Sequence, residues 1–386
     1  MKVVYLSSPF FTDNDICLLH HLSNKGLNVK YYIEIAPYNL KSTLFNIQKQ
    51  YPKTGIFPAS IYPDFQQYAD YINLDNIYVV NRCKESAYHP STIFLWIKLI
   101  FHIMKEHADV LYTTRVFKKS NIICYLIPLK KVLALHEPII HARKSSLWDK
   151  MYQKIANIFV KKLVFFNKKK LEPFCEIYNY DPANISVARL GFYDYLDKQK
   201  YLESEEKAPY ILFFGRITPY KGVKYLLDAM TVVHKSHPEV KLIVAGGGKI
   251  DFDVSDYKDF DYIDIRNRFI PEEELIGLLK KCLFSVAPYI SSTQSGVLLT
   301  AFSLGVPMVL TDVGVFSEMA NNEENGILVQ PGEVDSLANG INKLLDNPSL
   351  ISSMKKNIVE KWQKEMSWEP IADIFIDTFN DVIDHK

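Results

Sequence analysis

The sequence predicts an α/β protein made of two Rossmann-like domains that face each other across a cleft. Three observations support this fold class. The chain has 386 residues, too many for one ordinary α/β domain and enough for two, each with its own core. Short β-rich runs alternate with amphipathic segments of helix length, which is the pattern of a parallel sheet covered by helices. This alternation stops at a polar stretch near residues 194–208 and then begins again.

The first half of the chain is expected to form one sheet. Its β-rich runs predict strands at residues 3–6, 29–33, 77–80, 110–112, 132–135 and 163–166. Its amphipathic segments predict helices at residues 13–24, 146–160 and 168–178. Residues 92–104 are apolar but fewer than the roughly 18 that a membrane span needs, and they include Lys98 and His102. We therefore expect a buried helix there, within an N-terminal domain of residues 1–193.

The second half repeats the alternation. Its β-rich runs predict strands at residues 210–214, 241–245, 262–265, 283–287 and 308–310. Its amphipathic segments predict helices at residues 223–234, 272–281, 296–304 and 335–345. These elements define a C-terminal domain of residues 194–365. The final residues look helical, and Pro370 is expected to break or kink them because proline lacks the backbone N–H.

The cysteines and the first residues indicate a compartment. Five cysteines lie far apart without metal-ligand spacing, at Cys17, Cys83, Cys124, Cys175 and Cys282. Such spacing is typical of reduced thiols in a cytoplasmic protein. The chain runs from Met1 directly into a strand-like segment, so no signal peptide is expected.

Charge is distributed unevenly along the chain, although the net charge is only +1. Residues 1–200 hold 27 Lys+Arg against 16 Asp+Glu, and the remainder hold 18 against 28. Most of the excess lies in residues 101–170, with 15 basic and 4 acidic side chains. This asymmetry predicts a polyanionic surface as partner of the first half, and a solvated basic face without a partner is the alternative. Nucleic acid is not expected, because no known nucleic-acid-binding module accompanies the basic stretch.

The strongest chemical signal lies in residues 213–222. A hydrophobic strand ends at Gly215, Arg216 and Lys221 flank a turn, and Gly222 opens a helix. Ligands of open α/β sheets bind at the carboxyl ends of strands, where a guanidinium, an ammonium and free helix N–H groups can hold a diphosphate. In the alternative interpretation, Arg216 and Lys221 are ordinary surface cations. These ten residues alone leave both interpretations open.

A second signal lies in residues 289–301. Small polar residues follow a strand and lead into an apolar helix, whose N-terminus would face an anion. The hydroxyl and amide side chains of this segment are suited to ribose or sugar hydroxyls. A helix cap followed by a core helix is the alternative interpretation.

The two segments belong to a longer series of short matches. The others lie at residues 245–248, 269–275, 305–307, 314–318 and 325–329. Over about residues 208–346 the series resembles the family 4 glycosyltransferases of the GT-B fold. The resemblance implies that residues 366–386 form a helix packing back on the N-terminal domain. It also implies a nucleoside-diphosphate sugar as donor, retention of anomeric configuration, and neither a cofactor nor a metal.

The resemblance assigns individual residues. It implies that Arg216 and Lys221 hold the donor diphosphate and, with His136 near the donor sugar, carry the catalysis. The donor contacts that it implies are Gly215, Arg216, Lys221, Gly247, Arg268, Phe269, Ile270, Gln294, Ser295, Gly296, Val297, Thr300 and Glu318. A lone histidine after a strand is also a common structural residue. The loop before residue 13 lacks the glycines often found there, and Phe10 and Phe11 are core or acceptor-site residues.

One departure from the family concerns two glutamates that usually stand eight positions apart. The corresponding residues here are Ser292 and Thr300, so both carboxylates are missing. Gln294 is a candidate replacement for the first. The ribose partner stays open, with Glu318 as a candidate for which a helix-capping or surface role is the alternative.

The function expected from this pattern is a retaining glycosyltransferase of cell-surface polysaccharide or glycolipid biosynthesis, with a glycan or lipid-linked acceptor. A non-catalytic nucleotide-sugar-binding or partner subunit is the alternative that the missing glutamates suggest. A dehydrogenase is disfavoured, because neither half has Gly-x-Gly-x-x-Gly between a strand and a helix. Residues 147–162 mix aromatic, aliphatic and basic side chains, and Lys168, Lys169 and Lys170 follow. This segment predicts peripheral docking on an anionic membrane, with a helix packed on the sheet as the alternative.

Overall fold

The computed structural model describes residues 1–139, 146–291, 296–314 and 316–384. The chain divides into two compact units. Unit 1 comprises Met1–Gly191 and Trp368–Lys386, and unit 2 comprises Phe192–Ser367. The predicted domain boundaries, after residues 193 and 365, each lie two residues from these divisions.

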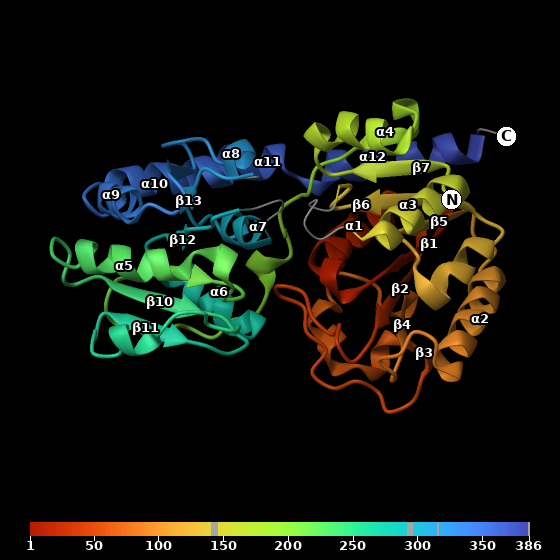
Figure 1. The fold of residues 1–386 in the computed structure, drawn as a ribbon, viewed down its shortest axis with the longest axis horizontal. Coiled ribbons are helices and arrows are strands. Elements are labelled where there is room, and N and C mark those ends of the chain that lie inside the picture. Colours follow the sequence, from red (N-terminus) through yellow and green to blue (C-terminus); the bar gives the residue numbers. More distant parts are fainter. Residues whose placement is uncertain (140–145, 292–295, 315, 385–386) are drawn as a thin grey trace. The chain divides into compact units, whose positions relative to one another are not determined.

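Unit 1 is built on an eight-stranded sheet (Figure 1). Its strands are β1 (Lys2–Ser7), β2 (Asn28–Ile35), β3 (Gly55–Pro58), β4 (Ile77–Asn81), β5 (Val110–Thr113), β6 (Lys130–Leu135), β7 (Lys162–Phe165) and β8 (Ile185–Val187). They lie in the order β3-β4-β2-β1-β5-β6-β7-β8. Every pairing is parallel except that of β3 with β4, so the carboxyl ends of seven strands meet at one edge.

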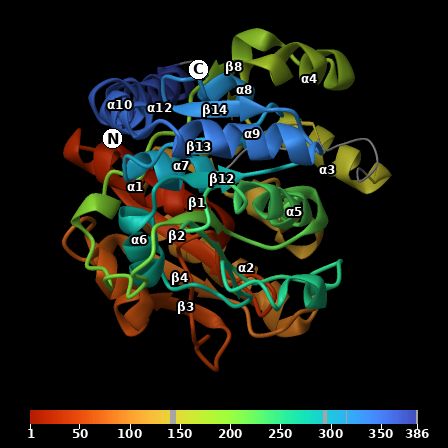
Figure 2. The same ribbon diagram turned by 90° about the vertical axis from the view of Figure 1, so that its left-hand side faces the viewer.

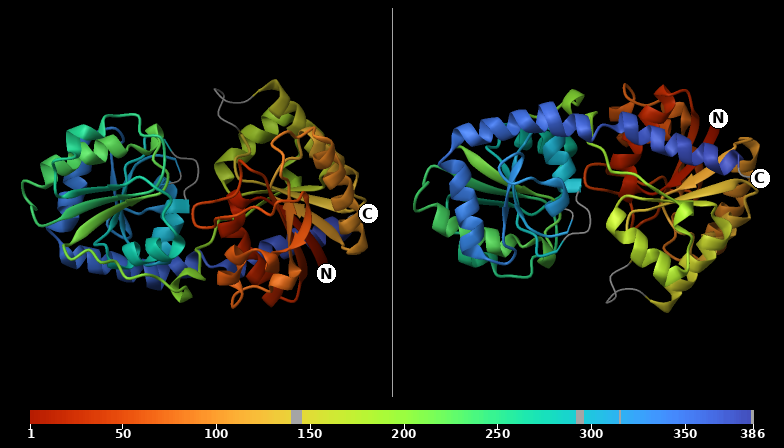
Figure 3. Two further views of the ribbon diagram at one scale, coloured as in Figure 1. Left: turned by 90° about the horizontal axis from the view of Figure 1, so that it is seen from below. Right: turned by 90° about the horizontal axis from the view of Figure 1, so that it is seen from above.

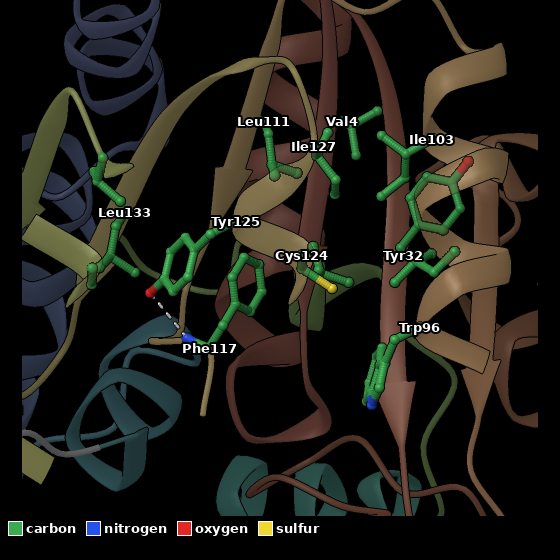
Figure 4. Packing of buried hydrophobic residues seen from close by; sticks show 14 of the residues in the cluster. Val4, Tyr32, Trp96, Ile103, Leu111, Phe117, Cys124, Tyr125, Ile127 and Leu133 are labelled. Carbon is green, nitrogen blue, oxygen red and sulfur yellow. Dashed lines mark hydrogen bonds between the residues drawn. The ribbon is translucent and has the colours of Figure 1, made fainter. Parts of the chain in front are cut away.

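One face of this sheet is covered by helices that share a single hydrophobic core with it. These helices are α2 (Pro90–Lys105), the 3₁₀ segment η5 (Lys119–Leu126), α3 (Leu147–Phe159) and α4 (Leu171–Tyr178). Figure 4 shows the centre of the core, where Trp96, Phe117, Cys124 and Tyr125 pack beside strand residues. The Tyr125 hydroxyl accepts a hydrogen bond from the Phe117 backbone N–H at 3.2 Å, so η5 is fixed to the chain that follows β5.

Two further helices, α1 (Thr12–Asn24) and the closing helix α12 (Trp368–Asp384), pack against each other, and α12 also packs against β5, β6 and β8 (Figure 3). The ring of Phe375 lies 5.4 Å from that of Tyr112 on β5, which fixes the closing helix to the centre of the sheet. Pro370 does not kink this helix, because it lies in the first turn, where no intrahelical bond needs its missing N–H. The interruption precedes it, at Met366 and Ser367.

Unit 2 contains a six-stranded, wholly parallel sheet. Its strands are β9 (Tyr210–Phe214), β10 (Lys241–Ala245), β11 (Ile263–Arg266), β12 (Ser285–Ala287), β13 (Met308–Thr311) and β14 (Gly326–Val329), in the order β11-β10-β9-β12-β13-β14. Its helices are α5 (Val223–Val233), α6 (Glu272–Lys281), α7 (Gly296–Ser303), α8 (Phe316–Met319), α9 (Val334–Leu345), α10 (Pro348–Asn357) and α11 (Gln363–Glu365), with a π-helical segment at Ile358–Trp362. Helices α5 and α9 lie side by side (Figure 2).

The helix α2 corrects one prediction. Residues 92–104 are helical as expected, but the helix is buried on one face only. Leu95, Trp96, Leu99 and Ile103 face the core, following the helical repeat. The opposite face exposes five large apolar side chains, at Ile93, Phe94, Ile97, Phe101 and Met104.

Candidate functional site

The carboxyl edge of the unit 2 sheet brings loop backbones close together. The loops after β9 and β10 touch, and a Cβ atom on Gly246 would lie 2.0 Å from the Gly215 carbonyl oxygen. Gly246 also has φ +155, a backbone conformation that favours glycine. Ile217 donates its N–H to the Gly247 oxygen at 3.2 Å, which continues the contact beyond the strands. The glycines therefore let residues that follow different strands lie side by side.

The helix α5 begins directly at this edge. A 3₁₀ turn, Pro219–Lys221, precedes it, and its first cap residue is Gly222 with φ +68. A Cβ atom at Gly222 would lie 1.9 Å from the Pro288 carbonyl oxygen, so no other residue fits without moving the chain after β12. This close approach places Lys221 next to Tyr289, although 68 positions separate them in the sequence.

Lys221 is a buried cation with an unusual partner. Its residue is only 9% exposed, and its ammonium donates a hydrogen bond to the Tyr289 hydroxyl. The Nζ atom also lies 3.7 Å from the centroid of the Tyr289 ring. Burial, together with the nearby charge of Arg216, lowers the pKa of Lys221 from 10.5 to about 7.

Arg216 is the second cation of this edge. It follows Gly215 at the end of β9, and its side chain is exposed. Within the described residues neither Arg216 nor Lys221 forms an ion pair with a carboxylate. Two cations that repel each other and form no ion pair in the described part of the chain make an arrangement that an anion would stabilise. The structure thus brings together the two cations that the sequence singled out.

The start of α7 lies against the end of β9. A Cβ atom on Gly215 would lie 3.1 Å from the Cγ2 atom of Val297, and Val297 itself is buried. Gly296 is the first residue of α7. The predicted donor contacts Gln294 and Ser295 lie outside the described residues, as does Ser292.

The Thr300 side chain is bonded within its own helix. It is fully buried in α7, and its hydroxyl donates to the Gly296 carbonyl oxygen at 2.7 Å, one helical turn earlier. This bond within the helix occupies the hydroxyl's single proton. The donor contact of Thr300 stays a prediction, and making it through the hydroxyl proton would require breaking this bond.

The predicted donor contacts Arg268, Phe269 and Ile270 follow β11. Arg268 is exposed and forms a two-pronged ion pair with Glu274 of α6, at 2.8 and 2.6 Å. Phe269 is half-buried and Ile270 is buried. Gly247 approaches this backbone, because a Cβ atom there would lie 3.2 Å from the Arg268 carbonyl carbon. These four predicted residues therefore lie together, and Glu274 is a neighbour that the sequence did not indicate.

Glu318 lies in α8 and is exposed. Phe316 of the same short helix packs its ring 5.0 Å from the ring of Tyr289, and Tyr289 in turn contacts Lys221. Beside the start of α5 lies a cavity of about 410 Å³ lined by Gly222 and nine other residues, among them Tyr225 and Asp228. Its lining includes neither Arg216 nor Lys221, so the cation pair lies outside it.

His136 belongs to unit 1, where it directly follows β6. Its imidazole lies between two aromatic rings, with centroids 4.1 Å from Phe11 and 4.4 Å from Phe166. Phe11 is half-buried in this stack, whereas Phe10 is 57% exposed. The stack fixes the imidazole plane at the carboxyl edge of the unit 1 sheet.

Two features are absent from the described residues: a cluster of metal ligands and a membrane-spanning helix. In the ranges 1–139, 146–291, 296–314 and 316–384, no group of three or more His, Cys, Asp or Glu side chains could hold a metal ion. Over the same part of the chain, no helix combines the length and the apolar character that crossing a membrane requires.

The architecture has many solved counterparts. HepE from Anabaena, in complex with UDP-glucose, superimposes with a TM-score of 0.70 at 15% identity, over 99% of this chain and 100% of that one. WaaG, a glycosyltransferase involved in lipopolysaccharide biosynthesis, gives a TM-score of 0.63 at 14% identity, over 100% of both chains. The predicted GT-B fold class, with two parallel-sheet α/β domains and a helical C-terminal end, is confirmed.

The second unit carries the family signature. Residues 196–361 match the family Glycosyl transferases group 1. An uncharacterized glycosyltransferase of Methanocaldococcus jannaschii is 28% identical over 232 residues, which are 54% of this chain and 57% of that protein. The GDP-mannose:cellobiosyl-diphosphopolyprenol alpha-mannosyltransferase of Xanthomonas oryzae pv. oryzae is 20% identical over 265 residues, 65% of this chain and 68% of that protein. The chain therefore matches the family Glycosyl transferases group 1 over residues 196–361 and is similar in sequence to glycosyltransferases.

Proposed function

We propose that this protein is a retaining glycosyltransferase of family 4 that transfers a sugar from a nucleoside-diphosphate sugar to a hydroxyl group of a glycan or lipid-linked acceptor. The observation that carries the proposal is the pair Arg216 and Lys221 at the carboxyl edge of the unit 2 sheet. Both cations lie within the region that matches the group 1 family. They are held beside the first turn of α5 and have no carboxylate partner among the described residues.

The proposed donor matches the chemistry of this edge. A diphosphate carries the charge that two cations and the helix N–H groups of α5 complement. Arg216 is exposed, so its guanidinium can donate two hydrogen bonds to one phosphate. Lys221 supplies a point charge from a buried position. HepE from Anabaena is solved with UDP and with UDP-glucose, which supports a nucleotide-sugar donor for a chain of the same fold.

In the proposed reaction, the bond between the anomeric carbon and the diphosphate oxygen breaks. The acceptor oxygen forms its bond to the same carbon on the same face, and its proton passes to a departing diphosphate oxygen. Negative charge grows on the diphosphate as the bond breaks, so Arg216 and Lys221 stabilise the transition state more than the ground state. His136 would contact the donor sugar. No metal takes part in this scheme, since the cations supply the positive charge.

A nucleotide panel tests this proposal. UDP, ADP, GDP and their glucose or mannose conjugates are added to the purified protein, and the unfolding midpoint is measured, because a ligand specific to the folded state raises it. We expect the nucleoside diphosphate of one nucleobase to raise the unfolding midpoint. The matching nucleotide-sugar should be hydrolysed slowly when no acceptor is present. The absence of any shift with all three diphosphates would contradict the proposal.

The alternative is a non-catalytic nucleotide-sugar-binding or partner subunit. It is favoured by the loss of the two family glutamates and by the burial of Thr300 at one of their positions. The same panel separates the two functions. A stabilising nucleotide-sugar that stays intact over long incubation with protein and candidate acceptors identifies a binding subunit.

The proposed acceptor is presented by an anionic membrane. One side of unit 1 carries the outer faces of α2, η5 and α3, which pack on the same sheet face. Phe101 of α2 and Trp148 of α3 are 62% and 65% exposed. The exposed cations Lys98, Lys105, Lys150 and Lys154 belong to these helices. Their one acidic residue, Asp149, is paired with Lys118 at 2.6 Å. Exposed aromatic and cationic side chains on one side are the pattern of an interfacial surface.

Trp148 provides the test of docking. Vesicles with anionic lipid should shift its fluorescence to the blue at low salt, and the shift should disappear as salt rises. Replacing Phe94 and Phe101 with Gln should weaken the binding, whereas Val359→Gln, at an exposed apolar position of unit 2, is the control. Equal responses to neutral and anionic vesicles would contradict docking, and the acceptor would then be soluble.

A further inference from the structure

The Tyr289 side chain holds the Lys221 ammonium in two ways. Its hydroxyl oxygen accepts a hydrogen bond from Nζ, and its ring centroid lies 3.7 Å from the same atom. A cation above the face of a tyrosine ring is attracted by the ring's electron density. Both residues of this contact are buried, since Lys221 is 9% exposed and Tyr289 is 1% exposed.

Tyr289 is itself fixed by neighbouring strands. It follows β12, and its carbonyl oxygen accepts a hydrogen bond from the Thr311 hydroxyl of β13 at 2.6 Å. On the other side, the N–H of Ile290 donates to the Tyr220 carbonyl oxygen at 2.8 Å, which connects the chain after β12 to the turn before α5. The backbone that carries the Tyr289 ring is therefore anchored independently of the Lys221 side chain.

The charged groups around Lys221 leave the ammonium available to a ligand. Arg216 is the nearby cation and repels it. Tyr220 contributes a second ring, 5.4 Å from Nζ. Asp228 of α5 is occupied by Lys224 at 2.8 Å and by the Tyr257 hydroxyl. Among the described residues, the ammonium thus has an aromatic and hydroxyl support but no carboxylate that a phosphate would have to displace.

We propose that Tyr289 is a positioning residue for donor binding, which holds the Lys221 ammonium toward the diphosphate without neutralising it through an ion pair. This inference rests on the proposed function and deepens it. A carboxylate in the same place would compete with the diphosphate for the cation. A tyrosine orients the lysine and leaves its charge for the ligand.

The arrangement predicts that donor binding takes up a proton. In the free protein the pKa of Lys221 is about 7, because the side chain is buried beside Arg216. A bound diphosphate stabilises the charged form and raises that pKa. The affinity for a nucleoside diphosphate should therefore fall above about pH 7, by up to tenfold per pH unit. Between pH 7 and 9 the phosphate is already fully ionised, so its own titration does not interfere.

The experiment compares Tyr289→Phe with the unmodified protein by titrating UDP, ADP and GDP calorimetrically at pH 7, 8 and 9. The substitution keeps the ring and removes the hydroxyl acceptor. We expect an affinity about tenfold lower at pH 7, the low end of the cost of losing one hydrogen bond to a charged group. The decline with pH should also begin at a lower pH, because the ammonium loses its acceptor. Tyr201→Phe is the matched control, since Lys280 lies 4.9 Å from the Tyr201 ring in the same unit.

A double-mutant cycle separates positioning from general structural support. If Tyr289 acts through Lys221, then Tyr289→Phe has no further effect in the Lys221→Met background. A Tyr289→Phe protein with the original affinity and pH profile, or a full effect in the Lys221→Met background, overturns the inference while diphosphate binding stands. If the unmodified protein binds none of the three diphosphates, the proposed function itself is overturned. If Tyr289→Phe is unstable, the pH profile of the unmodified protein alone decides, because a flat profile between pH 7 and 9 contradicts proton uptake.

Discussion

Two buried lysines, one in each unit, have similar burial and different surroundings. Lys131 of β6 in unit 1 is 6% exposed, and its ammonium donates to the carbonyl oxygens of Ile127 and Leu129 at 2.6 and 2.8 Å. Lys221 in unit 2 meets a tyrosine ring and hydroxyl instead. Burial lowers the pKa of both, to about 8 for Lys131 and about 7 for Lys221.

The difference teaches how a buried cation is used. Lys131 gives two of its three protons to carbonyl oxygens of the turn before its own strand, so it stabilises that turn. Lys221 lies at the carboxyl edge of a parallel sheet, next to another cation and the start of a helix, where ligands bind in this class of fold. Burial alone does not distinguish a structural lysine from a functional one. The two lysines differ in the acceptors of their hydrogen bonds, which are backbone carbonyl oxygens for Lys131 and a tyrosine hydroxyl for Lys221.

The largest expected effect is on catalysis. Arg216→Ala and Lys221→Ala should each weaken binding of the nucleoside diphosphate by about 1.5–3 kcal/mol, since each removes a charge-assisted contact to phosphate. Turnover of the nucleotide-sugar should fall further, because the charge on the diphosphate grows in the transition state. Steady-state kinetics with the donor identified by the nucleotide panel measures both effects. Original rates in both variants would refute the diphosphate site.

Lys131→Met should show the opposite behaviour. The substitution leaves the carbonyl oxygens of Ile127 and Leu129 without their donor, so we expect the free energy of unfolding to fall by about 1–3 kcal/mol. Nucleotide affinity should be unchanged. Urea unfolding and a nucleotide titration on the same preparation measure the two quantities, and a variant as stable as the original protein would remove the structural half of the comparison.

The pH dependence of stability sharpens the comparison. Each buried lysine has a lower pKa in the folded protein than the 10.5 of an exposed lysine, so the unfolded chain binds more protons. Stability should therefore rise with pH, from about pH 7 for Lys221 and about pH 8 for Lys131, up to about pH 10.5. Lys221→Met should reduce this rise more than Lys131→Met. Urea midpoints at pH 7, 8 and 9 test the order, and equal slopes in all three proteins would show that folding lowers the pKa of neither lysine.

The smallest effect on nucleotide binding is expected at His136. His136→Ala should leave nucleoside-diphosphate affinity nearly unchanged and lower the transfer rate, because the proposed contact is to the donor sugar. Phe166→Leu, which removes one ring of the aromatic stack, is the control for loss of packing. A folded His136→Ala protein that no longer binds the nucleotide would show that the histidine has another role.

Local sequence pattern was sufficient for most of the fold. Strands of unit 2 such as Tyr210–Phe214 and Lys241–Ala245 have the predicted bounds, because short apolar runs ended by glycine are specific for buried parallel strands. The sequence does not predict the strands β3, β8 and β14. The strand β3 has four residues, is antiparallel and ends in Pro58, β8 has three residues and β14 has four, so none of them has a recognisable period.

The site was predictable where a local motif carries it and not where packing creates it. Arg216 and Lys221 stand in one ten-residue segment, whereas the partnership of Lys221 with Tyr289 depends on the pairing of β9 with β12. The exposed face of α2 escaped prediction for a related reason. The helix α2 carries apolar residues on all its sides, so periodicity alone does not show which side meets the sheet. The packing of Trp96 and Leu99 in the core identifies that side.

The most direct test of the central claim is a calorimetric titration of UDP, ADP and GDP into three proteins: the original, Lys221→Met and Lys131→Met. The two substitutions are chemically identical and remove equally buried cations. We predict at least tenfold weaker binding for Lys221→Met and unchanged binding for Lys131→Met. Equal affinities in all three proteins, or a loss confined to Lys131→Met, would contradict the assignment of Lys221 to the donor diphosphate.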